Sequence, residues 1–147
     1  MKSKAKKKKE APRKRRITVS AAKGKGRRLQ QLACQKISEL TGLPWGTDES
    51  IASREGCQPG TDVRLVGEAR TLFPFSVECK DHDKWSEGKF RDWIEQASTN
   101  CMVDTYWLLV LKKTAKLKKD KIQPIVVMDL DDFFNMLSRL GGFDGSK

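Results

Sequence analysis

The sequence predicts an α/β domain in which helices flank a mixed central β-sheet. Three stretches place apolar residues at helical spacing, and short runs rich in β-branched and aromatic residues lie between them. Segments rich in Gly, Pro, Asp and Ser separate these runs. In chain order the pattern gives one helix, three strands, a second helix, two strands and a last helix (αβββαββα). At 147 residues the chain holds one such domain and little more.

The first helix is expected over residues 26–40. One stripe at helical spacing carries its apolar residues, which are Leu29, Leu32, Ala33, Ile37 and Leu40. Four basic residues crowd its start: Lys23, Lys25, Arg27 and Arg28. Cations at this end oppose the helix dipole, so their placement indicates either phosphate binding near exposed amides or a solvated helix end.

The middle of the chain predicts strands and the second helix. Residues 41–61 read as loops around one short strand, and two β-prone runs, 62–66 and 72–80, flank a turn-like segment. Ser86 is expected to cap a helix that runs to Asn100. The helix places its apolar residues on one face, typical of core packing: Phe90, Trp93, Ile94, Ala97 and Cys101.

Two more strands and a helix complete the prediction. TYWLLVLKK reads as a buried strand, and Pro124 makes KIQPIVVM an edge strand or one that starts late. The loop between them, KKTAKLKKDK, is strongly basic. DLDDFFNMLSRLGG predicts a capped helix, with Gly141 and Gly142 as its stop signal.

Charge divides the chain into a tail and a body. Residues 1–16 carry ten basic residues and one acid, which is +9 of the formal +11. This polycation has no apolar periodicity, so we expect a disordered tail that contacts nucleic acid or else serves in solubility or sorting. We expect a tail over 1–20, a domain over 21–142 and a short C-terminal tail over 143–147. Because no apolar segment long enough to cross a membrane follows the charges, we expect a soluble cytoplasmic protein without a membrane partner.

Two carboxylates and a lysine are expected to meet in the middle of the chain. If 62–66 and 72–80 form an antiparallel hairpin centred on Arg70, Asp62 falls opposite Glu78. Glu78 and Lys80 share a strand face because side chains alternate. Such a patch suits Mg²⁺ beside a phosphate, with the lysine at the attacking water. The alternative is an exposed Glu–Lys pair of little energetic value.

The segments AKGKGRRLQQL, PGTDV and FPFSVECK, followed by a helix that bears EQA, resemble the PD-(D/E)xK nuclease superfamily. Within it, the chain looks closest to archaeal-type Holliday-junction resolvases and small phage endonucleases. The resemblance spans roughly residues 23–138 and implies a restriction-endonuclease-like core. It implies phosphodiester hydrolysis in branched or structured DNA by a homodimer in a prokaryotic or phage-infected cell. Mg²⁺ is the implied cofactor, Mn²⁺ is able to substitute, and no small-molecule cofactor is expected.

The resemblance assigns roles to individual residues of this chain. Asp62, Glu78 and the backbone carbonyl of Cys79 would hold the metal, and Lys80 would act at the attacking water. Gln96 would complete the catalytic set, although an exposed helix glutamine is an equal alternative. The DNA-binding set would comprise Lys23, Lys25, Arg27, Arg28 and Lys84.

One departure from the pattern concerns the first helix, where many relatives supply another glutamate. Here the early turns carry Gln30 and Gln31, and Glu39 comes only late. The acid is therefore absent or replaced through water, which leaves the number of metals open. Other functions also stay open: an end-directed or nicking nuclease, a non-catalytic nucleic-acid-binding protein, or a subunit that acts only inside a larger assembly.

Overall fold

The computed structural model describes residues 19–55, 58–114 and 123–139. The predicted basic tail, the 115–122 part of the basic loop and the predicted glycine stop at 141–142 lie outside these residues. The helices and strands follow one another in the order α1 (Val19–Thr41), β1 (Ile51–Ser53), β2 (Val63–Leu65), α2 (Glu68–Leu72), β3 (Phe75–His82), α3 (Glu87–Thr99), β4 (Tyr106–Lys113), β5 (Ile125–Val127) and α4 (Leu130–Arg139).

The central sheet is mixed, as predicted. β3 and β4 run parallel, with Phe75 opposite Tyr106 at one end and His82 opposite Lys113 at the other. β5 begins directly after Pro124 and pairs antiparallel with β4, so it is an edge strand among the described residues. A separate antiparallel pair joins β1 to β2. This arrangement confirms the predicted α/β class with its mixed sheet and flanking helices.

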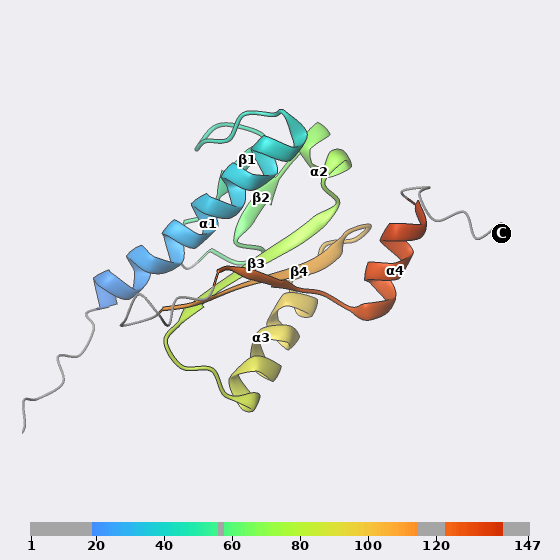
Figure 1. The fold of residues 1–147 in the computed structure, drawn as a ribbon. Coiled ribbons are helices and arrows are strands. Elements are labelled where there is room, and N and C mark those ends of the chain that lie inside the picture. The colour runs from blue at the N-terminus through green and yellow to red at the C-terminus, as the bar shows by residue number, and fades with distance from the viewer. Residues whose placement is uncertain (1–18, 56–57, 115–122, 140–147) are drawn as a thin grey trace, which may run out of the picture.

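Helices α1 and α3 cover opposite faces of the β3–β4–β5 sheet (Figure 1). Side chains alternate along β4, so Leu108 and Val110 pack toward α1, whereas Leu109 and Leu111 pack against Trp93 of α3. Leu109 and Leu111 are fully buried. Each such leucine contributes about 1.5–3 kcal/mol through removal of its side chain from water. Two apolar cores therefore pack against the two faces of β4.

The predicted hairpin is wrong. The segment expected to be its turn forms the short helix α2, which Gly67 introduces with a φ of 56°. β2 pairs with β1 instead, and this places Leu65 opposite Ile51 so that both side chains are buried. The residue pattern of 62–66 did not reveal that β1 is its pairing partner. β1 lies within the loop-rich segment 41–61, and no local rule links the two stretches.

The remaining elements follow the predictions with small shifts. α1 begins at Val19, earlier than expected, and Leu40 at its other end is 72% exposed rather than part of the core. Ser86 caps α3 by accepting a hydrogen bond from the Lys89 amide at 3.4 Å. Asp129 caps α4 through the amides of Asp131 and Asp132. In the part of the chain that the structure describes, no helix is long and apolar enough to span a bilayer.

Candidate active site

Asp62 lies at the free edge of β3, on the side away from β4. Its backbone amide donates to the Val77 carbonyl at 2.9 Å, and its carboxylate oxygen Oδ2 accepts from the Cys79 amide at 2.7 Å. The Asp62 side chain thus satisfies a strand-edge donor that a neighbouring strand would otherwise occupy. Asp62 is held next to Glu78 by these two bonds to β3, and not by the hairpin pairing predicted from the sequence.

Gln30 fixes the other carboxylate oxygen of Asp62. Its Nε2 atom donates from α1 to Asp62 Oδ1 at 2.7 Å. With both oxygens bonded, the carboxylate has one orientation, supported from α1 and from β3. Gln30, one of the two glutamines in the early turns of α1, therefore supports Asp62 through a hydrogen bond. Glu39 is exposed on the last turns of α1, where Lys36 Nζ lies 2.6 Å from its Oε2.

Glu78 is the buried centre of a second network. Only 3% of its surface is exposed, yet it carries a carboxylate. Lys80 Nζ and Gln96 Nε2 both donate to Glu78 Oε1 at 2.8 Å. Lys80 Nζ also donates to Gln96 Oε1 at 2.7 Å. The three side chains form a closed ring of hydrogen bonds, so Gln96 faces the site and is not merely an exposed helix glutamine.

The two carboxylates influence each other. Burial raises the pKa of Asp62, and the negative charge of Glu78 raises it further. The Cys79 amide, Lys80 and Gln30 oppose this rise in pKa, but they do not cancel it. The Asp62 carboxylate therefore lacks full charge compensation from the protein, and a divalent cation would supply it.

The donor set fits a hard cation. In an extended strand the N–H and C=O of one residue point to the same side, so the Cys79 carbonyl points toward the edge where its amide meets Asp62. Two carboxylates and a carbonyl are oxygen ligands of the kind that Mg²⁺ and Mn²⁺ prefer. No group of three or more His, Cys, Asp and Glu side chains comes together among the residues with described positions. This protein would thus hold an ion with few side-chain ligands and leave the remaining positions to water and phosphate.

Comparison with known proteins agrees with this geometry. A family model described as "Phage putative PDDEXK endonuclease" matches residues 21–140. The chain belongs to this family. No curated protein and no solved structure matches it. The mixed sheet with α1 and α3 on its two faces is accordingly the restriction-endonuclease-like core of a PD-(D/E)xK protein.

The PD-(D/E)xK site opens beside a polar groove of about 440 Å³ at the start of α1. Lys23 and Arg27 line this groove together with Gln30, since all three lie on one helix face. Lys25 and Arg28 do not line it, and Lys84 is exposed in the loop after β3. The structure thus brings two of the five predicted DNA-binding residues next to the site and leaves the other three apart from the groove.

Two further residues of the endonuclease site were missed from the sequence. Asn100 Nδ2 donates at 3.4 Å both to Glu78 Oε2 and to the Gly60 carbonyl, and therefore ties α3 to the turn before Asp62. It lies one helical turn after Gln96, so helical spacing could have indicated it. Arg54 lines the same groove as Lys23 and donates from Nη1 to the Pro59 carbonyl. No pattern in the sequence marked Arg54.

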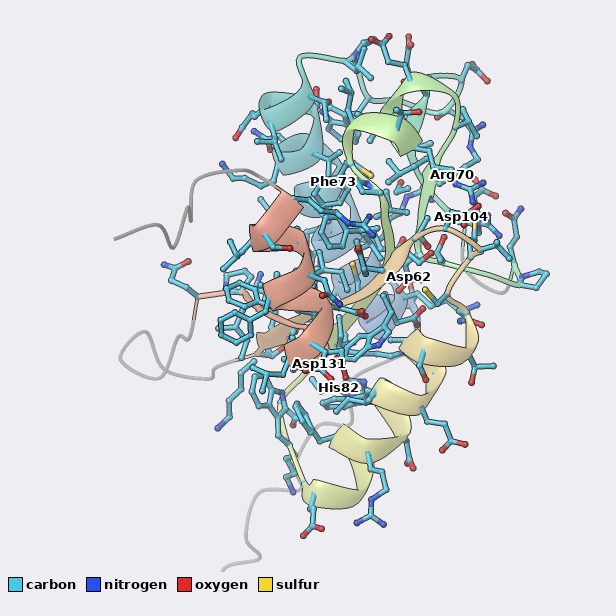
Figure 2. All side chains as sticks on the ribbon, turned by 90° about the vertical axis from the view of Figure 1, so that its right-hand side faces the viewer. Asp62, Arg70, Phe73, His82, Asp104 and Asp131 are labelled. Carbon is cyan, nitrogen blue, oxygen red and sulfur yellow. The ribbon has the colours of Figure 1, made fainter. Side chains whose placement is uncertain are left out.

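Gly60 shapes the turn that delivers Asp62. Its φ is +99°, and a Cβ at this position would lie 2.6 Å from Arg54 Nη1. The positive φ strains any larger residue at this position, and Arg54 would also have to shift its guanidinium. Asp62 is half-buried in the bend before β2, and Figure 2 marks its place among the side chains near the middle of the view.

Proposed function

We propose that this protein is a divalent-metal-dependent DNA endonuclease that acts as a homodimer on branched or structured DNA, in the manner of a Holliday-junction resolvase. The observation that carries the proposal is the meeting of Asp62, Glu78 and Lys80 around one strand edge. A Glu–Lys pair kept only for stability has no need of a second carboxylate, which raises the electrostatic cost of the site.

In the proposed reaction, water attacks the phosphorus of a phosphodiester bond and the bond to the leaving sugar oxygen breaks. Asp62, Glu78 and the Cys79 carbonyl would hold Mg²⁺ or Mn²⁺, which when bound stabilises charge on the phosphate and acidifies a water. Lys80 would orient the attacking water, and Gln96 would aim the Lys80 ammonium through their 2.7 Å hydrogen bond. Lys23, Arg27 and Arg54 would contact the neighbouring phosphates without reading bases.

The proposal is tested with labelled four-way junction, flap and linear duplex DNA in Mg²⁺, Mn²⁺ or EDTA. We expect cleavage with either metal, none in EDTA, and a preference for the junction. Lys80→Met should be inactive, whereas the matched control Lys36→Met, which changes an exposed α1 lysine, should cleave normally. Binding without cleavage in every metal would instead favour a non-catalytic nucleic-acid-binding protein.

A second candidate is an end-directed or nicking nuclease on the same fold. The monomeric site favours it, because one set of Asp62, Glu78 and Lys80 cuts one strand. Supercoiled circular DNA that extrudes a cruciform separates the candidates: an end-directed enzyme leaves it intact, a nicking enzyme relaxes it, and a junction-cutting endonuclease with paired sites linearises it.

A further inference from the structure

An apolar groove of about 1040 Å³ lies on the face of the sheet that α1 only partly covers. Phe73, Tyr106 and Leu108 line it from the sheet side, and Phe133 and Met136 line it from α4. A second apolar cavity of about 510 Å³ runs on beneath α1 and shares Phe73 and Leu108 with the first. An α/β sheet of this kind normally has both faces covered, but none of the described segments fills this face over β4 and β5.

Helix α4 is poorly covered by the described part of the chain. None of its residues is buried, and Leu130 and Phe134 are 69% and 60% exposed. Its apolar residues nevertheless follow the spacing of a helix that packs on one side. The adjacent edge strand β5 exposes Val126 to 63%. Several large apolar side chains thus form one continuous exposed surface, which soluble monomers seldom show.

The charges at the two ends of α4 suit a second copy of the same helix. Asp131 and Asp132 occupy its first turn and Arg139 its last. Figure 2 shows α4 in front of the sheet, with Asp131 at its lower end. If two copies pack α4 antiparallel across a two-fold axis, the acidic end of each helix meets the basic end of the other. The surface is therefore complementary to itself in both charge and apolar character.

We propose that α4, β5 and the groove beside them form the homodimer interface, with the two α4 helices antiparallel. This inference rests on the proposed function, because cutting both strands of a DNA needs two sites and each chain carries one. The interface leaves the sites open, because the apolar groove reaches α1 at its last residues, Leu40 and Thr41, whereas Gln30, which holds Asp62, lies nearer the start of that helix.

The oligomeric state of the full chain, measured by sedimentation equilibrium without DNA or metal, tests the interface. We expect a wild-type dimer. Phe134→Asp should weaken it by roughly 30-fold or more, the effect of losing one central aromatic anchor. Phe134 is 60% exposed, so the variant should fold normally, which circular dichroism verifies. The matched control is Val103→Asp, at a 79% exposed position in the loop before β4, and it should remain dimeric.

Disulfide cross-linking tests the orientation of the helices. Position 134 lies at the middle of α4, so Phe134→Cys should cross-link to its own counterpart across a two-fold axis, and Val103→Cys should not. A monomeric wild type overturns the inference. This holds whether other segments of the same chain cover the groove or leave it open. An unweakened Phe134→Asp dimer overturns it as well. A wild-type dimer that cuts no DNA would support the interface and contradict the proposed function. A monomeric variant that nicks circular DNA but does not linearise it would support both the interface and the proposed function.

Discussion

Replacing Lys80 by Met should separate the structural and chemical roles of the lysine. In the metal-free protein, Lys80 Nζ lies 2.8 Å from Glu78 Oε1, and the two side chains are 16% and 4% exposed. Loss of one partner of a buried ion pair costs about 3–5 kcal/mol, because a charge stays buried without compensation. Gln96 and Asn100 still donate to Glu78 after the change. These neutral donors reduce the expected loss of unfolding free energy to about 2 kcal/mol.

Urea unfolding at pH 7 in EDTA measures this loss. Adding Glu78→Gln to Lys80→Met removes the stranded charge, so the double variant should regain stability and the cycle should show a coupling of about 1–3 kcal/mol. Cleavage by Lys80→Met should fall by roughly 10²–10³-fold or more, with DNA binding within a few-fold of wild type. Two results together would refute the buried network: a loss of unfolding free energy below about 0.5 kcal/mol, which is usual for a surface change, and zero coupling between the two substitutions.

Three further predictions concern the metal ligands, their support and the tail. Asp62→Asn and Glu78→Gln should each weaken Mg²⁺ or Mn²⁺ binding in calorimetry. Asp62→Asn should also stabilise the metal-free protein by roughly 0.5–2 kcal/mol at neutral pH, since burial and Glu78 raise the Asp62 pKa and the charged form is costly. Gln30→Ala should lower metal affinity or activity by roughly 10–100-fold, because Asp62 loses its α1 donor. Removal of residues 1–16 should weaken DNA binding on all sequences and flatten the slope of log affinity against log salt by roughly 0.9 per lost phosphate contact, without abolishing cleavage at low salt.

Each of these has an outcome that would count against it. Unchanged metal affinity in both acid variants would remove Asp62 and Glu78 from the ligand set. For Gln30 the matched control is Gln31→Ala on the same helix turn, and equal effects of the two would show a general helix defect. An unchanged salt slope after truncation would assign the tail to sorting or to a protein partner.

The pairing of Glu78 with Lys80 could be predicted because strand alternation is a local rule. Val77 precedes Glu78, and Cys79 lies between Glu78 and Lys80. These two apolar residues mark the opposite face of the strand, and both are buried in the structure. Gln96 could be predicted in the same way from its angle to the apolar stripe of α3. Their meeting in one hydrogen-bonded ring confirms that the residues lie together, and their roles in cleavage remain predictions.

Asp62 lies beside β3 as predicted, but the strand pairing used to predict its position was wrong. β-propensity in 72–80 suggested a hairpin, yet the residues between the two runs form α2, and Asp62 bonds to β3 through its backbone amide and its carboxylate. Such side-chain replacement of a strand pairing leaves no periodic signal. The exposure of Leu40 and of α4 was not predictable either, because an apolar stripe does not reveal whether its partner lies in the same chain.

Cleavage of a labelled four-way junction by Glu78→Gln and wild type, with Mg²⁺ and with EDTA, tests the central claim most directly. The change keeps the shape of the side chain at the centre of the network, removes its charge and replaces one acceptor oxygen by an amide donor. Metal-dependent cutting by the wild type and a loss of at least roughly 10²-fold in the variant is the expected result. Equal cutting by both proteins, or cutting by the wild type in EDTA, would contradict a metal-dependent site built on Asp62, Glu78 and Lys80.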